Sequence, residues 1–259
     1  PTMGGVIIII GIIFSTLLWA DLTNIYVWTL IFVSLSLGGL GLLDDILKIK
    51  FRNSQGLKSR YKFIGQLIIS AIALFILIKL SDHSFLFELH FPFLKNFIWH
   101  MGIFFIPFGL FVIIGASNAV NLTDGLDGLA TVPVMLVALS FTLISYVVGN
   151  TIFSEYLKIQ YIPDVGELSI FCGSIVGACL GFLWYNAPPA KIFMGDTGSL
   201  SLGGSLGAMG IITKHEIVLA ITGGLFVLEA VSVMVQVISY KLTGKRIFKM
   251  APIHHHFEK

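Results

Sequence analysis

Long apolar runs alternate with short polar connections along most of this chain. The runs that approach or reach the length of a bilayer-crossing helix occupy residues 3–20, 25–43, 63–80, 102–117, 129–148, 167–185, 199–212 and 217–240. The run at 199–212 is short and rich in glycine and serine, which is typical of a helix packed closely among others. The pattern predicts one all-α domain over residues 1–259, a polytopic bundle of eight transmembrane helices.

Two connections between the runs are long enough to hold structure of their own. Residues 81–101 alternate polar and aromatic side chains, which predicts a short hairpin on the membrane surface. Residues 149–166 are expected to form an irregular loop. Four histidines are placed by the span count at the same membrane face as these two connections: His83, His90, His100 and His215. They are expected to be structural or solvated.

Composition supports the membrane assignment and argues against nucleic acid as a partner. The 259 residues are 56% hydrophobic and 12% charged, whereas soluble domains are roughly 25% charged. The formal net charge of +2 is too small to indicate nucleic-acid binding. Cys172 and Cys179 lie seven positions apart in one apolar run and are interpreted as reduced packing residues. The lipid bilayer is therefore the expected environment.

The charges that do occur are unevenly distributed between the two membrane faces. Eight spans place the loops 44–62, 118–128 and 186–198 and the tail 241–259 on one side. That side holds 12 of the 16 lysines and arginines, so the positive-inside rule makes it cytoplasmic. The same face collects the acidic residues and histidines that are candidates for chemistry: Asp44, Asp45, Asp124, Asp127, Asp196 and His254 to His256.

The most polar stretch between two spans is Asn118 to Ala130. Asn118, Asn121, Asp124 and Asp127 recur every three residues, and carboxylates bounded by apolar segments indicate function or a water-filled cavity. Gly125 and Gly128 permit sharp bending or close approach of a ligand. The alternative is a polar turn that only connects two helices.

Two further acidic motifs flank apolar runs. Asp44-Asp45 follows the second run, where adjacent carboxylates suit a base or a metal ligand, although a solvated helix end is the alternative. The stretch Phe193 to Leu200 contains a Gly-Asp-Thr-Gly-Ser turn that enters a helix. Free backbone N–H groups, hydroxyls and one carboxylate suit a phosphate with its Mg²⁺; an ordinary capped helix start at Thr197 or Ser199 is compatible with the same residues.

The C-terminal stretch Ala251 to Glu258 carries three consecutive histidines. Adjacent residues cannot all face one metal from a regular helix, so hydrogen bonding to phosphates or proton transfer is the favoured interpretation. Glu229 and Gln236 lie seven apart on the last span and so on one side of it. A carboxylate in a span is a functional candidate, and a helix-packing hydrogen bond is the equal alternative for Glu229.

Taken together, these motifs resemble the polyprenyl-phosphate N-acetylhexosamine-1-phosphate transferase superfamily. The matching segments run the length of the chain: Pro1 to Gly5, Asp44-Asp45, Asn118 to Leu129, Phe193 to Leu200, and Pro252 to Glu258. The Pro-Thr-Met-Gly-Gly start and the Pro-Ile-His-His-His-Phe-Glu tail resemble its muramoyl-pentapeptide branch. That family has ten spans, so a chain with eight is expected to lack the first and last helices.

The resemblance implies a magnesium-dependent transfer at the cytoplasmic face of the bacterial inner membrane. Phospho-MurNAc-pentapeptide would pass from UDP-MurNAc-pentapeptide to undecaprenyl phosphate, giving lipid I and UMP, the first membrane step of peptidoglycan synthesis. Direct attack by the lipid phosphate is favoured over a covalent enzyme intermediate, because it needs one displacement and a single metal. A homodimer is compatible with the resemblance.

The resemblance also assigns roles to particular residues. Asp196 would hold Mg²⁺, Asp44 would accept a proton from the lipid phosphate or orient it, and Asp45 would assist. Asn121, Asp124 and Asp127 would shape the nucleotide pocket, with Phe193 stacked on uracil. The remaining polar lining, in which His254 is also counted as catalytic, would be Thr2, Lys62, Asn186, Gly195, Ser199, Gln236, His254 and His255.

Two other functions are compatible with part of the pattern. A related enzyme that moves N-acetylglucosamine-1-phosphate shares the acidic motifs, but the triple-histidine tail argues against it. An ion-coupled transporter usually holds its site near the middle of the bilayer, often between inverted repeats. Here the acids gather at one surface and no repeat is visible, so only Glu229 favours transport.

Overall fold

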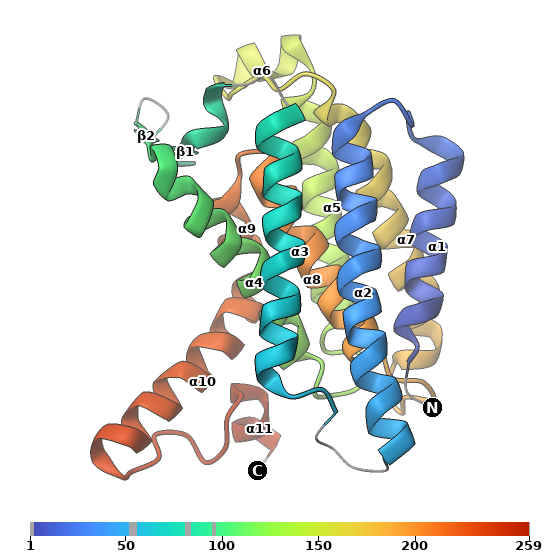
Figure 1. Cartoon of the computed structure of the whole chain (residues 1–259), viewed down its shortest axis with the longest axis vertical. Coiled ribbons are helices and arrows are strands. Elements are labelled where there is room, and N and C mark those ends of the chain that lie inside the picture. Colours follow the sequence, from blue (N-terminus) through green and yellow to red (C-terminus); the bar gives the residue numbers. More distant parts are fainter. Residues whose placement is uncertain (1–2, 52–55, 81–83, 95–96, 259) are drawn as a thin grey trace.

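The computed structural model describes residues 3–51, 56–80, 84–94 and 97–258, and most of them are helical. The helices are α1 (Gly5–Trp19), α2 (Ile25–Phe51), α3 (Ser59–Leu80), α4 (Phe105–Thr123), α5 (Thr131–Val148), α6 (Thr151–Leu157), α7 (Leu168–Asn186), α8 (Gly195–Ile212), α9 (Glu216–Thr222), α10 (Gly224–Thr243) and α11 (Ile253–Glu258). Short 3-10 turns occupy Ser84–Phe87, Gly102–Phe104 and Val165–Glu167. Figure 1 shows most of the long helices side by side in one bundle, with α10 projecting from it.

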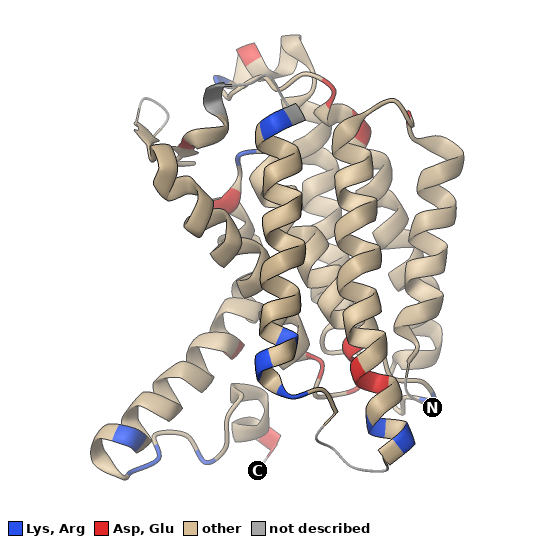
Figure 2. Ribbon diagram, in the orientation of Figure 1, with Lys and Arg blue, Asp and Glu red and all other residues tan. Residues whose placement is uncertain are grey.

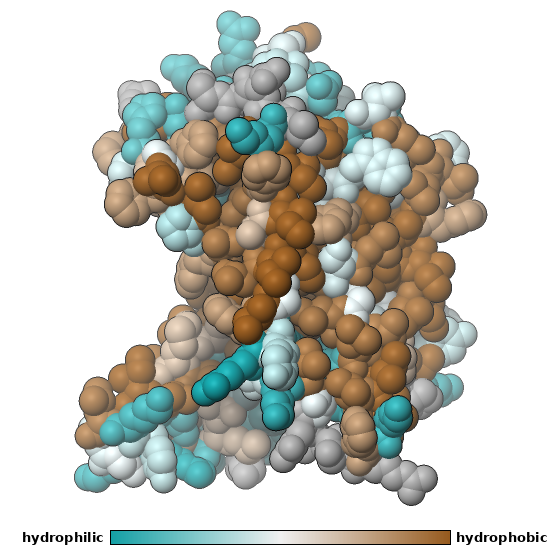
Figure 3. All heavy atoms as spheres, viewed as in Figure 1, coloured by the Kyte–Doolittle hydropathy of each residue, from teal (hydrophilic) through white to brown (hydrophobic). Residues whose placement is uncertain are grey.

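Six helical segments in the described part of the chain are long and apolar enough to cross a membrane: Ile25–Phe51, Ser59–Lys79, Gly102–Thr123, Thr131–Val148, Val165–Asn186 and Gly224–Thr243. Each overlaps a predicted run. The other two runs form α1, of 15 residues, and α8, of 18. Figure 3 shows an apolar surface across the middle of the molecule, with hydrophilic residues toward both ends. The chain is therefore an all-α, multi-pass membrane protein.

Helix α8 occupies the centre of the bundle. Every residue from Thr197 to Ile212 is buried, which explains why this stretch alternates small and apolar residues without a polar face. The prediction that the glycine- and serine-rich run packs closely among other helices is confirmed.

Glycines let the neighbouring helices approach α8 at backbone distance. A side chain on Gly203 would start 2.5 Å from the carbonyl oxygen of Ala116, and one on Gly207 would start 2.8 Å from Cα of Ile113. Both partners lie on α4. Hydroxyls then join the helices, because Ser201 Oγ donates to the Ser34 carbonyl at 2.8 Å. Small residues and hydroxyls at helix contacts are the usual means of packing inside a bilayer.

Two predicted runs extend further as helices than their apolar residues suggest. Helix α2 continues to Phe51, so Asp44 and Asp45 lie inside it rather than at its end. Helix α4 continues to Thr123, which places Asn118 and Asn121 on a helix and not in the expected loop at 118–128. Hydropathy marks where lipid contact ends, whereas the helix ends where backbone hydrogen bonding ends.

The run at 217–240 forms two helices, α9 and α10, and the expectation of one helix is wrong. The break falls at Gly223 and Gly224, and glycine is the weakest helix former after proline. Beyond the break α10 leaves the bundle at an angle, and α11 lies beside it (Figure 1). Most of the large apolar residues of α10 are exposed, Leu228 and Leu242 among them.

The connections at the end of the bundle away from α11 agree only partly with the sequence-based expectations. The predicted hairpin is confirmed, because β1 (Glu88–His90) pairs antiparallel with β2 (Ile98–His100). The loop expected at 149–166 contains helix α6, whose N-terminus is capped by Asn150 accepting from Ile152 N–H at 3.0 Å. An asparagine before an apolar run is an N-cap signal.

Cys172 and Cys179 are buried and free, as predicted.

We predict that Gly207→Ala lowers the melting temperature by several degrees, because the added methyl group meets the backbone of α4 and overpacking costs about 1–3 kcal/mol. Gly177→Ala on α7 is the matched control, since open space surrounds that position. There the same change should be neutral or stabilising. Thermal unfolding in detergent measures both, and equal melting temperatures for the two variants would contradict the close α4–α8 contact.

Candidate active site

Three carboxylates from two helices meet at one end of the bundle. Asp44 and Asp45 of α2 and Asp196 of α8 each offer an oxygen within 4.8 Å of the others. Asp44 is 2% exposed and Asp45 5%. The approach depends on Gly41, where a side chain would collide with the carbonyl oxygen of Asp196. Distant acidic motifs of the sequence are thus joined because α2 and α8 pack at backbone contact.

Asp45 accepts hydrogen bonds from the first turn of α8. One of its oxygens accepts from Thr197 N–H at 3.0 Å and from the Thr197 hydroxyl at 2.7 Å. The other accepts from Asp196 N–H at 3.3 Å. A carboxylate at a helix N-terminus satisfies free N–H groups and interacts favourably with the helix dipole. Asp45 therefore caps α8 from a neighbouring helix and fixes where Asp196 stands.

Two lysines compensate the charge of the acidic cluster. Lys48 Nζ lies 2.5 Å from Asp44 Oδ2 and 3.0 Å from Asp196 Oδ2. Lys62 Nζ lies 2.7 Å from Asp196 Oδ2. Figure 2 shows acidic and basic residues gathered at the lower end of α2 and α3. Lys62 was predicted as part of the site. Lys48 was missed, although its spacing of four residues from Asp44 is the spacing of helical ion pairs.

The end of α4 completes the surroundings of Asp196. Asn121 Nδ2 donates to Asp196 Oδ1 and to Ser199 Oγ, each at 2.8 Å. Asn118 turns the other way and donates to Gln66 of α3 at 3.0 Å. Of the four polar residues of the array, only Asn118 and Asn121 lie on α4, and they contact different partners; Asp124 and Asp127 follow the end of the helix.

The turn after α4 places two more predicted residues next to the start of α8. Burial, assisted by the nearby carboxylates of Asp196 and Asp45, raises the pKa of Asp124 to about 7, despite the hydrogen bond from Gly195 N–H. Gly195 has a φ of +73°, and a side chain there would start 2.8 Å from Asp45 Oδ2. Asp127 Oδ2 accepts from Ala190 N–H at 2.9 Å, which ties this turn to the loop that precedes α8.

Other predicted binding residues are engaged by the protein itself. Asn186 accepts from the Thr131 hydroxyl at 2.7 Å and donates to the Ile192 carbonyl at 3.0 Å. Gln236 Oε1 accepts from the backbone N–H groups of Ile247 and Phe248, each at 3.0 Å. Asn186 thus holds the loop that precedes α8, and Gln236 holds the loop that follows α10. Phe193 is 46% exposed, and Thr2 lies outside the described residues.

The three histidines of the tail have three different surroundings. His254 is buried, with Nδ1 3.1 Å from Glu229 Oε2. His255 Nδ1 lies 2.9 Å from Glu258 Oε2, and His256 Nδ1 accepts from Lys249 N–H at 3.1 Å. The three rings therefore have different polar partners. Of the three, His254 faces the turn after α4, where a side chain on Gly125 would collide with Nε2.

The acidic cluster is chemically suited to a divalent cation. It combines three carboxylates with two lysines, Lys48 and Lys62, which leaves an excess of one negative charge when all five are ionised. Oxygen ligands at this spacing are those that Mg²⁺ and similar cations use. In the described residues this is the one group of three or more metal-ligating side chains close enough to share an ion.

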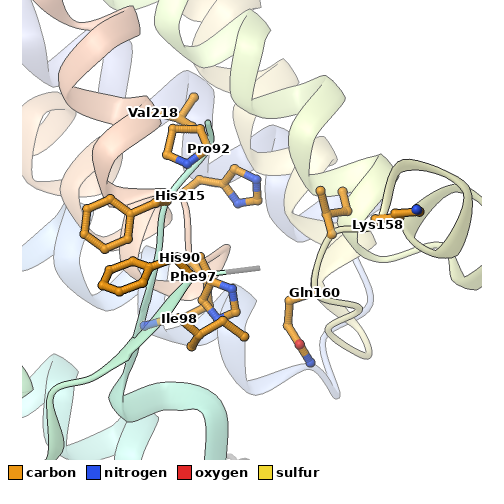
Figure 4. Close-up of a pocket in the computed structure, with 11 residues that line it drawn as sticks. His90, Pro92, Phe97, Ile98, Lys158, Gln160, His215 and Val218 are labelled. Atoms are coloured by element: carbon orange, nitrogen blue, oxygen red, sulfur yellow. The ribbon is translucent and has the colours of Figure 1, made fainter. Parts of the chain in front are cut away.

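A pocket of about 240 Å³ lies at the other end of the bundle. Figure 4 shows side chains of the hairpin, among them His90 and Phe97, facing His215, which precedes α9, and Gln160 of the loop after α6. His215 follows the C-terminal end of α8, whereas Asp196 lies in its first turn. The 18 residues of α8 correspond to roughly 27 Å, so this pocket is separate from the acidic site. His83 lies outside the described residues.

Comparison with known proteins identifies the family. A model of "Glycosyl transferase family 4" matches residues 27–214. The whole chain is 66% identical to the "Phospho-N-acetylmuramoyl-pentapeptide-transferase" of Pelagibacter ubique (strain HTCC1062), and it spans 72% of that relative. It is 56% identical over 260 residues to the protein of the same name from Rhodopseudomonas palustris (strain BisB18), again spanning 72% of it. The chain therefore belongs to the phospho-N-acetylmuramoyl-pentapeptide-transferases of glycosyl transferase family 4.

Proposed function

We propose that this protein transfers phospho-MurNAc-pentapeptide from UDP-MurNAc-pentapeptide to undecaprenyl phosphate, giving lipid I and UMP. The observation that carries the proposal is the cluster of Asp44, Asp45 and Asp196 with Lys48 and Lys62, at one end of a membrane bundle. One substrate is soluble and the other is a lipid, so the reaction needs a polar site where the bilayer meets water. The names of the relatives support this substrate class.

We place the site on the cytoplasmic face of a bacterial inner membrane, with eight spans that include α1, α8 and the α9–α10 pair. The excess of lysine and arginine in the connections at that face supports this orientation. UDP-linked substrates are cytoplasmic, which agrees with it. The count includes α8 because its neighbours shield it from lipid, and a helix shielded in this way need not be strongly apolar.

We propose that the cation is Mg²⁺ and that Asp196 is its principal ligand, with Asp44 and Asp45 beside it. When bound, the ion neutralises charge on the diphosphate of the nucleotide substrate. The described geometry supports Asp196 because its carboxylate already gathers Lys48, Lys62 and Asn121. This arrangement positions the carboxylate with its oxygens toward the other two acids.

The reaction forms one phosphorus–oxygen bond and breaks another. An oxygen of the lipid phosphate attacks the phosphorus attached to MurNAc, and the oxygen that bridges to the uridine-linked phosphate leaves with UMP. Asp44, buried at the cluster, accepts any proton of the lipid phosphate or orients it. Lys48 and Lys62 stabilise charge on the phosphate oxygens. Phosphoryl transfer depends mainly on such positioning and charge neutralisation.

We assign the uridine end of the substrate to the loops around Asp124 and Phe193. Asn121, Asp124, Asp127 and Ser199 line the approach from α4 and α8, and exposed Phe193 offers an aromatic face for stacking on uracil. Asn186 and Gln236 shape this approach by holding neighbouring loops, as their backbone hydrogen bonds indicate. His254, His255 and Thr2 remain part of the proposed lining.

The central test is the assay of the purified full-length protein for UMP and lipid I. UDP-MurNAc-pentapeptide, undecaprenyl phosphate and Mg²⁺ should give both products, and UDP-GlcNAc in place of the first substrate should give neither. Asp196→Asn should reduce turnover by about 10²–10³-fold, the usual effect of losing a transition-state charge contact. Asp21→Asn, on an exposed aspartate at the other end, is the matched control. Near-normal turnover of the Asp196 variant would remove its assigned role.

Cation binding can be tested apart from turnover. Adding Mg²⁺ to the chelator-treated protein should raise the melting temperature, because a ligand that binds only the folded state stabilises it. Asp196→Asn should abolish that increase, and Asp21→Asn should preserve it. The same increase in both variants would place the cation elsewhere.

The sequence did not predict a role for Lys48 in the site, whereas its contacts in the structure do. Lys48→Met should lower turnover by about 10–100-fold, since it removes a cation that contacts both Asp44 and Asp196. Lys50→Met, two residues further along α2 and exposed, should leave turnover unchanged. Equal activity of the two variants in the UMP assay would show that Lys48 only balances charge in the resting protein.

A further inference from the structure

Glu229 is a buried carboxylate on a helix whose first three turns otherwise present mostly apolar side chains to their surroundings. It is 1% exposed, whereas the flanking Leu228 is 59% exposed. In the described part of α10 only Phe226, Glu229 and Ser232 are buried. A carboxylate in a membrane helix is costly unless a partner compensates it, so its burial calls for a specific contact.

That contact is His254, from the tail. The same oxygen of Glu229, Oε2, lies 3.1 Å from His254 Nδ1 and accepts from the His254 backbone N–H at 3.4 Å. One carboxylate oxygen therefore restrains both the ring and the start of α11. A carboxylate beside Nδ1 favours the tautomer with the proton on that nitrogen, in the way that carboxylates orient histidines in other sites.

The second ring nitrogen points toward the candidate active site. Both ring nitrogens of His254 are buried and lack an aligned hydrogen-bond partner among the described residues. Nδ1 still has the close contact with Glu229, whereas Nε2 has none. It lies against Gly125, at a position that a side chain there would fill. Gly125 follows Asp124, which accepts a hydrogen bond from Gly195 at the start of α8. A buried polar atom without a partner is rare and calls for an explanation; a substrate atom at the Asp124–Gly125 turn supplies one.

We infer that Glu229 is a positioning residue that sets the tautomer and direction of His254, so that Nε2 faces the substrate at the Asp124–Gly125 turn. This inference rests on the proposed function. It also explains why α10 keeps a carboxylate where it leaves the bundle: the bond to α11 places the tail histidine over the turn after α4. Glu229 itself touches neither the acidic cluster nor the turn through any contact found in the described residues.

The test compares Glu229→Gln with a matched change elsewhere. Glutamine keeps the size of the side chain but can present either an oxygen or an amide N–H to Nδ1, so the ring direction is no longer fixed. Glu229→Gln should lower kcat by about 10-fold with little change in KM for the nucleotide substrate. Glu216→Gln is the control, since Glu216 is an equally buried carboxylate at the far end, paired with Lys214. It should affect stability alone.

A double variant separates positioning from stability. If Glu229 acts through His254, then Glu229→Gln should cause no further loss of kcat in a His254→Asn background. Multiplying losses in the double variant, or wild-type kcat for Glu229→Gln, would overturn the inference while leaving the proposed function intact. Absence of UMP from the wild-type protein would instead remove the proposed function.

A spectroscopic measurement tests the pair without turnover. In protein labelled with ¹⁵N-histidine, the resonances absent from His254→Asn belong to His254. They should show a proton on Nδ1 in the wild type and a mixture of tautomers in Glu229→Gln. A single unchanged tautomer in both proteins would contradict the assigned role of Glu229, whether or not the assay detects product.

Discussion

The contact that the rest of this structure depends on is the backbone-to-backbone packing of α8 against α2 and α4. It requires glycine at Gly41, Gly203 and Gly207, because a side chain at each would meet the backbone of the opposing helix. Once the helices are this close, Asp44 and Asp45 reach the first turn of α8, and Asn121 reaches Asp196 from the other side. The geometry of the candidate site therefore depends on the small side chains at the contacts between α8 and its neighbours.

Much of this arrangement could be predicted from the sequence, because lipid imposes a simple rule on apolar length. Each of the six candidate spans overlaps a hydropathy run, and the predicted span parity groups Asp44, Asp124 and Asp196 at one end. The hairpin at Glu88–His100 also followed from alternation. The ends of helices did not, because Asp44 and Asn121 continue helices that hydropathy had already ended. Lys48 was overlooked since its charge also satisfied the positive-inside rule.

The pairing of Glu229 with His254 shows what sequence patterns cannot supply. The sequence leaves function and helix packing equally open for Glu229, because its partner His254 lies 25 residues further along, beyond the end of α10 and the bend of the tail. No periodicity relates the two. The direction in which α10 leaves the bundle decides which groups the tail can meet, and that direction depends on tertiary packing at the α9–α10 junction.

Two groups of buried charged residues in the described part of the chain differ in their balance of charge. At the far end, Lys214 and Glu216 match one to one, and Lys214 also donates to the Leu86 carbonyl and lies 4.0 Å from the centre of the Phe105 ring. At the candidate site, three carboxylates face two lysines, and one aspartate oxygen is shared by both cations. The Lys214–Glu216 pair balances its own charge, although Glu216 Oε2 has no hydrogen-bond partner among the described residues. A cluster with an excess negative charge is stabilised when a cation binds. The imbalance, more than the number of acids, distinguishes the candidate site from the balanced pair at the far end.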